Sequence, residues 1–281
     1  MKNRLHYLLI KILFICLILL SLIGTAQIKY GSNNGSYLTI RNTKIYYETY
    51  GTGAPLILLH GGIGNIGNFK NSIPELSKKY KVIIPDAPGH GRSELADSAL
   101  SYQLIADYCS KMIDLLKLDS TYIMGWSDGG IEALLLAKNR PDKVKKIIAV
   151  GPNYRADGLK PDEVGDWGPN FSLNKFEKNF TQWITFYNTI SPQKDWKRLV
   201  TESNRMWFKE EYFPLSDLTK INIPVLIVFG DRDQYKLEHG LEMHRAIKNS
   251  QFCVIPNCSH SIFFEKPDLM NQLAIDFLNN K

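Results

Sequence analysis

The sequence predicts an α/β protein with a mostly parallel sheet, helices on both faces of that sheet and an inserted helical cap. Three observations support this prediction. Short apolar runs, typical of strands buried on both faces, alternate along the chain with segments of helical spacing. Glycine-containing polar segments follow the ends of these runs, where parallel sheets place their binding sites. Residues from about 153 to 220 interrupt the alternation without a strong apolar strand.

The first 26 residues have the composition of a secretory signal peptide. Three basic residues precede or begin an apolar run at 12–23, and small residues precede Gln27. The run is shorter than the roughly 20 residues of a membrane-spanning helix. We therefore expect residues 1–26 to be removed on export to the periplasm or the medium, and residues 27–281 to form one domain. An uncleaved N-terminal membrane anchor is the alternative.

Charge and cysteine content exclude several classes of protein. The net charge of +6 includes three basic residues and no acid from residues 1–26, so +3 remains, dispersed along the chain, and no nucleic-acid surface is predicted. An odd number of cysteines remains after residue 26, at irregular spacing. They predict buried free thiols, with a Cys253–Cys258 disulfide as the alternative. Cysteines and histidines lack zinc-site spacing, and no metal or organic cofactor is expected.

The expected elements follow from apolar runs and helical spacing. A hairpin is expected at 37–49, with its turn at Asn42-Thr43. Further strands are expected at 55–60, 81–85, 122–124, 145–150, 224–229 and 252–255. Helices are expected at 104–118, 131–139 and 268–278.

The expected cap, at about 153–220, is rich in aromatic residues. It contains four of the five tryptophans of the chain: Trp167, Trp183, Trp196 and Trp207. These side chains either line a substrate pocket or pack the cap against itself and the core, and the sequence leaves both interpretations open.

Residues 125–129, GWSDG, lie between a predicted strand and a predicted helix. This is the context of a nucleophile elbow, in which glycines at the flanking positions remove side chains that would clash. The turn exposes the serine at a helix N-terminus, where free N–H groups favour developing negative charge. We therefore predict that Ser127 is a nucleophile.

A nucleophilic serine needs a base, and the base needs an orienting carboxylate. Asp231 and Asp233 follow a strand after the cap, and His260 follows the last strand, in the order Ser, Asp, His that is typical of G-x-S-x-G hydrolases. We prefer Asp233 over Asp231 because the more distal position gives the loop room to turn towards the histidine.

An acyl-transfer site also needs N–H donors for the oxyanion. We predict the backbone N–H of Asp128 and that of Gly62, which lies in the HGGIGN loop after the 55–60 strand. Ile63 is the one-residue alternative to Gly62. Trp126, Asp128 and Ile63 are expected to contact the substrate.

Five segments carry a resemblance to a known family: LLHGGIG, DAPGHGRS, GWSDGG, FGDRDQ and NCSHSIFFEKPD. In their order and spacing the chain resembles the α/β-hydrolase superfamily over essentially its whole mature length. The resemblance implies the α/β-hydrolase fold, with Ser127 as nucleophile, Asp233 as acid and His260 as base. The DAPGHGRS segment usually supports the pocket in this family, so His90 and Arg92 are not expected to be catalytic.

The elbow and its helix, GWSDGGIEALLLA, resemble valacyclovir hydrolase and its biphenyl hydrolase-like relatives. In that family the aspartate after the serine helps to bind a substrate's α-ammonium group, which implies this role for Asp128. A carboxylate beside an oxyanion hole repels the developing charge unless a cation lies between them. The alternative is that Asp128 bonds N–H groups of the first helical turn and faces solvent.

We therefore expect an exported serine hydrolase that cleaves a small carboxylic ester through an acyl-enzyme. The same triad used for C–C bond hydrolysis, lactone opening or perhydrolysis is one alternative. A catalytically silent binding protein on the same fold is another.

Overall fold

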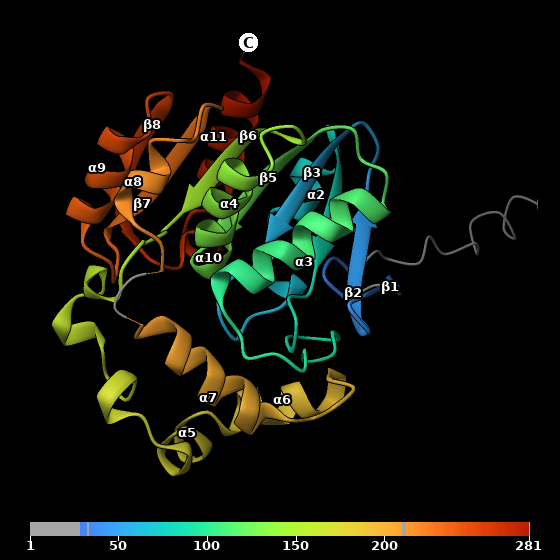
Figure 1. The fold of residues 1–281 in the computed structure, drawn as a ribbon, viewed down its shortest axis with the longest axis vertical. Coiled ribbons are helices and arrows are strands. Elements are labelled where there is room, and N and C mark those ends of the chain that lie inside the picture. The colour runs from blue at the N-terminus through green and yellow to red at the C-terminus, as the bar shows by residue number, and fades with distance from the viewer. Residues whose placement is uncertain (1–28, 33, 210–211, 281) are drawn as a thin grey trace, which may run out of the picture.

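The computed structural model describes residues 29–32, 34–209 and 212–280. The expected signal peptide lies outside the described residues, so its cleavage before Gln27 stays a prediction. A single eight-stranded sheet crosses the molecule in the order β1-β2-β4-β3-β5-β6-β7-β8 (Figure 1). The β1–β2 and β2–β4 pairs are antiparallel and all other neighbours are parallel, which confirms the mostly parallel sheet. Within the described ranges no helix is both long and apolar enough to cross a membrane.

The strands lie close to where the apolar runs predict them. They are β1 (Ser36–Ile40), β2 (Thr43–Tyr50), β3 (Ala54–Leu59), β4 (Tyr80–Pro85), β5 (Thr121–Trp126), β6 (Val144–Val150), β7 (Val225–Arg232) and β8 (Ser250–Ser259). The hairpin turn is at Arg41 and Asn42, one residue before its predicted place, because Thr43 pairs with Ile40. Both turn residues have positive φ, as tight hairpins require.

Helices cover both faces of the sheet (Figure 1). Buried residues of α3 (Tyr102–Leu115), α4 (Asp128–Asn139) and α9 (Leu237–Ala246) form one core with the inward side chains of one face. Those of α2 (Ile73–Leu76), α10 (Ile262–Glu265) and α11 (Pro267–Asn279) form a second core on the opposite face. Strand β3 serves both, because its side chains alternate between the two cores.

An inserted helical segment lies between β6 and β7, beyond one end of the sheet (Figure 1). It contains η2 (Ala156–Gly158), η3 (Pro161–Glu163), η4 (Gly168–Asn170), α5 (Leu173–Asn179), α6 (Thr181–Ile190), α7 (Trp196–Trp207) and α8 (Leu215–Leu218). Leu199 and Val200 of α7 are fully buried in the same core as α3 and α4, which seats the cap on the sheet domain.

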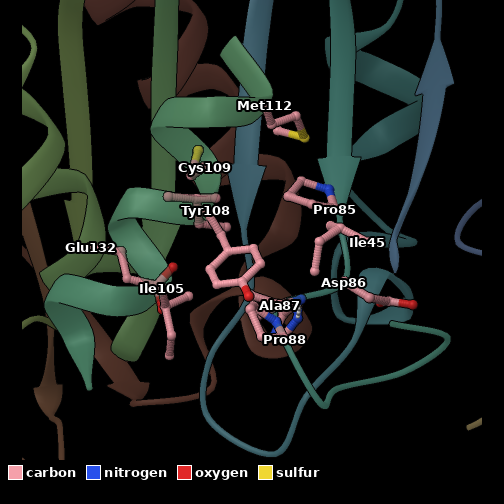
Figure 2. Close-up of a pocket in the computed structure, with 12 residues that line it drawn as sticks. Ile45, Pro85, Asp86, Ala87, Pro88, Ile105, Tyr108, Cys109, Met112 and Glu132 are labelled. Atoms are coloured by element: carbon pink, nitrogen blue, oxygen red, sulfur yellow. Dashed lines mark hydrogen bonds between the residues drawn. The ribbon is translucent and has the colours of Figure 1, made fainter. Parts of the chain in front are cut away.

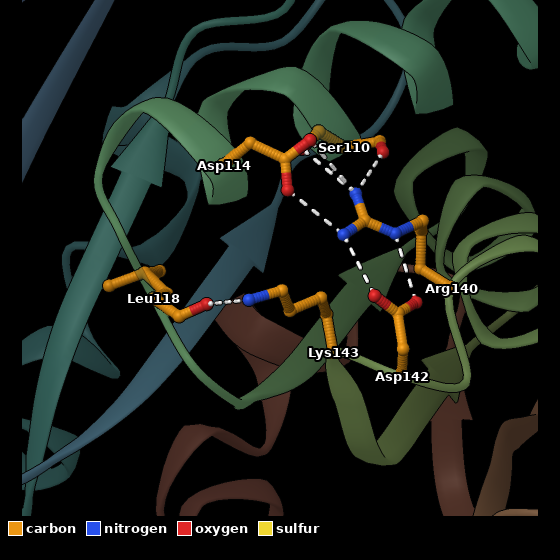
Figure 3. Close-up of polar contacts among 6 residues, drawn as sticks. All are labelled: Ser110, Asp114, Leu118, Arg140, Asp142 and Lys143. Carbon is orange, nitrogen blue, oxygen red and sulfur yellow. Dashed lines mark hydrogen bonds and ion pairs between the residues drawn. The ribbon is translucent and has the colours of Figure 1, made fainter.

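The opposite end of the α3–α4 pair is held by charged side chains. Figure 3 shows Arg140, the residue after α4, between two carboxylates: it donates to Asp114 of α3 at 2.9 Å and to Asp142 at 3.0 Å. Lys143 donates to the Leu118 carbonyl at 3.1 Å. Arg140 and Lys143 therefore link the segment between α4 and β6 to the end of α3 and the residues after it.

The three cysteines of the described residues are free. Cys109 and Cys258 are buried and Cys253 is half-buried. The prediction of free thiols is confirmed in this respect, and the alternative of a Cys253–Cys258 disulfide is wrong.

Candidate active site

Ser127 lies at a sharp turn between β5 and α4. Its φ of 56° and ψ of −119° are strained for a residue with a side chain. The turn closes so tightly that a Cβ on Gly125 would lie 1.9 Å from the Gly129 carbonyl oxygen. One on Gly129 would lie 2.2 Å from the Leu59 oxygen. Side chains at both flanking positions are therefore excluded, for the reason that the sequence predicts.

The structure brings Asp233 and His260 together at the carboxyl ends of β7 and β8. The imidazole Nδ1 donates to Asp233 Oδ1 at 2.9 Å, and the backbone N–H of Tyr235 donates to the same oxygen at 3.1 Å. Asp233 is buried. This geometry agrees with our choice of Asp233, and not Asp231, as the carboxylate that orients the histidine. Asp231 is exposed and accepts a hydrogen bond from the Cys258 N–H at 3.0 Å, which joins β7 to β8.

His260 Nε2 is buried and unpaired within the described part of the chain. Since Nδ1 carries the proton that Asp233 accepts, Nε2 has a free lone pair. Ser127 and His260 line the same cavity but form no hydrogen bond with each other among the described residues.

Gly151, directly after β6, is a site residue that the sequence analysis did not assign. Its φ is +58°, and a Cβ there would lie 2.6 Å from His260 Cε1 and 2.8 Å from Nδ1. Only glycine lets the imidazole ring lie this close to the strand end. The signal was present, because Gly151 ends a predicted strand at the edge where sites occur.

The loop after β3 runs against the elbow. A Cβ on Gly61 would lie 3.1 Å from Ser127 Cβ. Among the described residues, the N–H groups of Gly62, Ile63 and Asp128 donate to no backbone carbonyl outside the helices and strands, and all three residues line the cavity that contains Ser127. Ile63 has a φ of 47°, and its carbonyl accepts a hydrogen bond from Trp183 Nε1 at 2.8 Å.

A cavity of about 430 Å³ opens over Ser127, between the sheet domain and the cap. All the predicted substrate-contacting residues line it, and Trp126 also donates from Nε1 to the His260 carbonyl at 2.9 Å. Among the described residues, its wall contains the carboxylates Asp128 and Glu163 and no lysine or arginine. Its aromatic residues are Trp126, Trp167, Phe180, Trp183, Trp207, Phe208, Tyr212 and Tyr235.

The cap tryptophans therefore divide between the two roles that the sequence left open. Trp167, Trp183 and Trp207 line the cavity. Trp196 is buried instead and stacks on Phe176 inside the cap, with ring centroids 5.8 Å apart.

Asp128 is buried beside Ser127, and the alternative in which it faces solvent is wrong. Its Oδ1 accepts from the Tyr102 hydroxyl at 3.0 Å and its Oδ2 from Trp207 Nε1 at 2.7 Å. Burial raises the pKa of Asp128 to about 6, although both hydrogen bonds act in the opposite direction. Binding of an ammonium group by Asp128 stays a prediction.

A second cavity, of about 20 Å³, lies under the site between α3, β3 and α4 (Figure 2). It has room for about one water molecule and none for a substrate. Figure 2 shows Tyr108, Cys109 and Glu132 around it. Burial raises the pKa of Glu132 well above its usual range and lowers that of His60, which also lines this cavity, to about 4. His60 is therefore neutral near pH 7, and burial favours the protonated form of Glu132.

Across the described ranges, no group of three or more His, Cys, Asp and Glu side chains is placed to hold a metal ion.

Comparison with known proteins agrees with this architecture. A family model described as alpha/beta hydrolase fold matches residues 54–195, half of the chain. A 2-hydroxy-6-oxo-6-phenylhexa-2,4-dienoate hydrolase of Burkholderia cepacia is 27% identical over 279 residues, which cover 89% of this chain and 98% of that protein. A pimeloyl-[acyl-carrier protein] methyl ester esterase of Neisseria meningitidis is also 27% identical, over 241 residues that cover 79% of this chain and 92% of the esterase.

Among solved structures, the enol-lactonase of Burkholderia xenovorans superimposes with a TM-score of 0.71. The two are 18% identical, and the superposition covers 87% of this chain and all of that one (100%). The similarity supports the fold. With the sheet order, the elbow and the matching family model, it shows that the chain belongs to the α/β-hydrolase family.

Proposed function

We propose that this hydrolase cleaves carboxylic esters through an acyl-enzyme formed on Ser127. The single observation that carries the proposal is the Asp233–His260 hydrogen bond, because it leaves a buried, unpaired Nε2 in the cavity that Ser127 lines. Asp233 fixes the tautomer in which Nδ1 is protonated and stabilises the imidazolium that forms when His260 accepts the serine proton.

The reaction then needs only groups of this site. As Ser127 attacks the ester carbonyl, His260 Nε2 takes its proton, and the N–H groups of Gly62 and Asp128 donate to the oxyanion. Collapse of the tetrahedral intermediate expels the alcohol, which receives the proton from His260. Water next attacks the acyl-enzyme with His260 as base, and the carboxylic acid leaves.

The charge of the cavity favours an uncharged ester over a carboxylate substrate. The Burkholderia cepacia relative is named for a dienoate, which is a carboxylate, and the Neisseria meningitidis relative for a methyl ester. Here the described residues of the cavity wall offer no lysine or arginine to pair with a substrate carboxylate. Cleavage of a C–C bond in an anionic dienoate is therefore the less favoured use of this triad, together with lactone opening and perhydrolysis.

A fluorophosphonate probe and a panel of nitrophenyl esters test the proposal. We expect the probe to label the wild type and not Ser127→Ala. Asp233→Asn should lower kcat by about 10⁴-fold, the scale known for such a change in a serine triad. Asp231→Asn is the matched control, since its amide oxygen still accepts from the Cys258 N–H, and it should retain activity.

A wild-type protein that neither reacts with the probe nor hydrolyses any ester would instead support the silent binding protein. Equal losses in Asp233→Asn and Asp231→Asn would contradict the assigned role of Asp233.

A further inference from the structure

The ends of three helices meet at the Asp128 carboxylate. Asp128 is the first residue of α4, Tyr102 is the first residue of α3, and Trp207 is the last residue of the cap helix α7. Each carboxylate oxygen accepts one hydrogen bond, Oδ1 from the Tyr102 hydroxyl and Oδ2 from the Trp207 indole. A buried carboxylate with two donors from different elements holds those elements in fixed relation.

The Trp207 ring lies against the loop that carries a predicted oxyanion donor. A Cβ on Gly62 would lie 2.3 Å from Trp207 Cζ2 and 2.6 Å from Asp128 Oδ2. The indole and the carboxylate therefore both contact Gly62, beside the place where the ester carbonyl would bind. Trp207 therefore contacts this loop at Gly62, as the cap residue Trp183 does at the Ile63 carbonyl.

The cap holds the other side of the Trp207 indole. The Trp167 ring meets it edge to face, with centroids 4.9 Å apart, and the Tyr212 hydroxyl donates to the Trp207 carbonyl. The rings of Tyr102 and Tyr212 in turn lie 4.6 Å apart. These contacts restrain the orientation of the indole, and the hydrogen bond to Asp128 adds a further restraint.

We infer that the Asp128 side chain positions Trp207 as the wall that selects the acyl group of the substrate. This inference rests on the proposed ester hydrolysis. It gives the carboxylate a purpose without a substrate cation, because both oxygens already have donors from the protein. An acyl group that carries a carboxylate is disfavoured, because the described residues of the wall include the carboxylates of Asp128 and Glu163 and no lysine or arginine, while most of the wall is aromatic.

Three substitutions separate positioning from charge. Asp128→Asn can keep both contacts: its amide oxygen accepts from the indole, and its NH₂ donates to the Tyr102 oxygen, whose hydroxyl hydrogen turns away. Asp128→Ala removes both contacts. Trp207→Phe keeps a ring and removes the N–H, leaving Oδ2 buried without its donor.

The measurement is kcat/KM for nitrophenyl esters of increasing acyl length, expressed as the ratio of long to short ester. We expect Asp128→Ala and Trp207→Phe to change this ratio by about tenfold or more, the scale of selection in apolar pockets. Asp128→Asn should change it much less. Tyr102→Phe, which removes the other donor and leaves the cavity wall in place, should give an intermediate change.

Two results would overturn the inference. One is an unchanged ratio in both Asp128→Ala and Trp207→Phe. The other is an equal change in Asp128→Asn and Asp128→Ala, particularly if both lose aminoacyl esters more than neutral ones, because that pattern requires the charge and indicates an ammonium ligand.

Failure of the proposed function is distinguishable, because the wild type would then hydrolyse no ester at all. In that case hydrogen exchange of α7, measured by mass spectrometry on the folded protein, still tests the contact. Faster exchange in Asp128→Ala than in Asp128→Asn supports positioning, and equal exchange contradicts it.

Discussion

At the scale of single residues, three missing side chains shape the site as much as the reactive ones do. Gly125 and Gly129 let the strand and helix of the elbow touch, and Gly151 lets the His260 ring lie against the end of β6. The two elbow glycines belong to a recognisable pentapeptide. Gly151 does not, and its contact with His260 spans more than a hundred residues of sequence, so only the folded chain reveals its role.

Gly151→Ala should therefore lower activity far more than it lowers stability. The new methyl group would lie 2.6 Å from His260 Cε1 and would push the imidazole away from its place beside the cavity. We expect kcat to fall about 10²-fold, the effect of roughly 1 Å of misplacement. The measurement is ester turnover together with thermal denaturation.

Gly165→Ala is the matched control for that change. Gly165 also has a positive φ, of +54°, but nothing lies within 4 Å of its would-be Cβ. Gly165→Ala introduces the same type of backbone strain without a contact to His260, so this variant should lose a little stability and keep its turnover. Equal loss of turnover in the two variants would show that strain, and not the His260 contact, is responsible.

At the scale of elements, the cap also holds the loop that carries Asp233. Leu159 and Tyr235 form an antiparallel bridge, and the backbone N–H of Lys160 donates to the Gln234 carbonyl at 3.0 Å. The Lys160 ammonium group donates to the Asp233 carbonyl at 2.5 Å. The cap, which forms part of the cavity wall, thus also holds the loop of Asp233, the acid of the proposed triad.

Removal of this ammonium group should loosen the acid loop. In Lys160→Met the backbone bridge remains, while the hydrogen bond to the Asp233 carbonyl is lost. We expect kcat to fall by about tenfold with a smaller change in KM, because the affected group orients the base and does not touch the substrate. Lys175→Met, at an exposed cap lysine paired with Asp166, should leave both constants unchanged. Similar effects of the two would contradict the brace.

The elements also show which parts of the fold the sequence can predict. The strands from β3 to β7 are mostly buried and appear as continuous apolar runs, so they were predictable to within a few residues. β1 and β2 were predictable as a hairpin. β8 departs most, because its ladder with β7 continues to Ser259, past the apolar run at 252–255. The sequence of α9 lacks the apolar spacing that predicts a helix, because only part of one face of this helix is buried. The Asp128–Trp207 contact joins residues 79 apart, and neither residue type alone reveals its partner.

At the scale of the whole molecule, buried ionisable groups beneath the site give the fold a pH dependence. Burial lowers the pKa of His60 to about 4 and that of His90 to about 3, with mutual repulsion adding to the second shift. The two rings lie 5.2 Å apart, and neither has a carboxylate partner in the part of the chain that the structure describes. His60 bonds backbone groups of Gly61 and Ala87, and His90 donates to the Pro88 carbonyl.

The pKa shifts of the two histidines and the pKa shift of Asp86 have opposite effects on stability as the pH falls. A histidine with a lowered folded-state pKa contributes stability above the unfolded pKa of 6.5, and this contribution is lost as the pH falls towards the folded value. Asp86 behaves in the opposite way, since burial raises its pKa to about 7. The contribution of Asp86 to stability is fully present below pH 3.8, the unfolded pKa, and is lost as the pH rises through the folded pKa of about 7. The carboxyl group thus offsets part of the acid sensitivity that the two rings create.

His90→Gln should expose that balance, because glutamine can donate to the Pro88 carbonyl but cannot take up a proton in the unfolded chain. At pH 7.5 the variant should be less stable than the wild type, since it fills the buried site less well. Between pH 6.5 and 4 the wild type loses the His90 contribution and the variant does not, so the difference in free energy of unfolding should narrow steadily. Urea unfolding at several pH values measures it. A difference that stays constant from pH 7.5 to 4 would mean that His90 takes up protons equally well in the folded and unfolded chain, contrary to its burial.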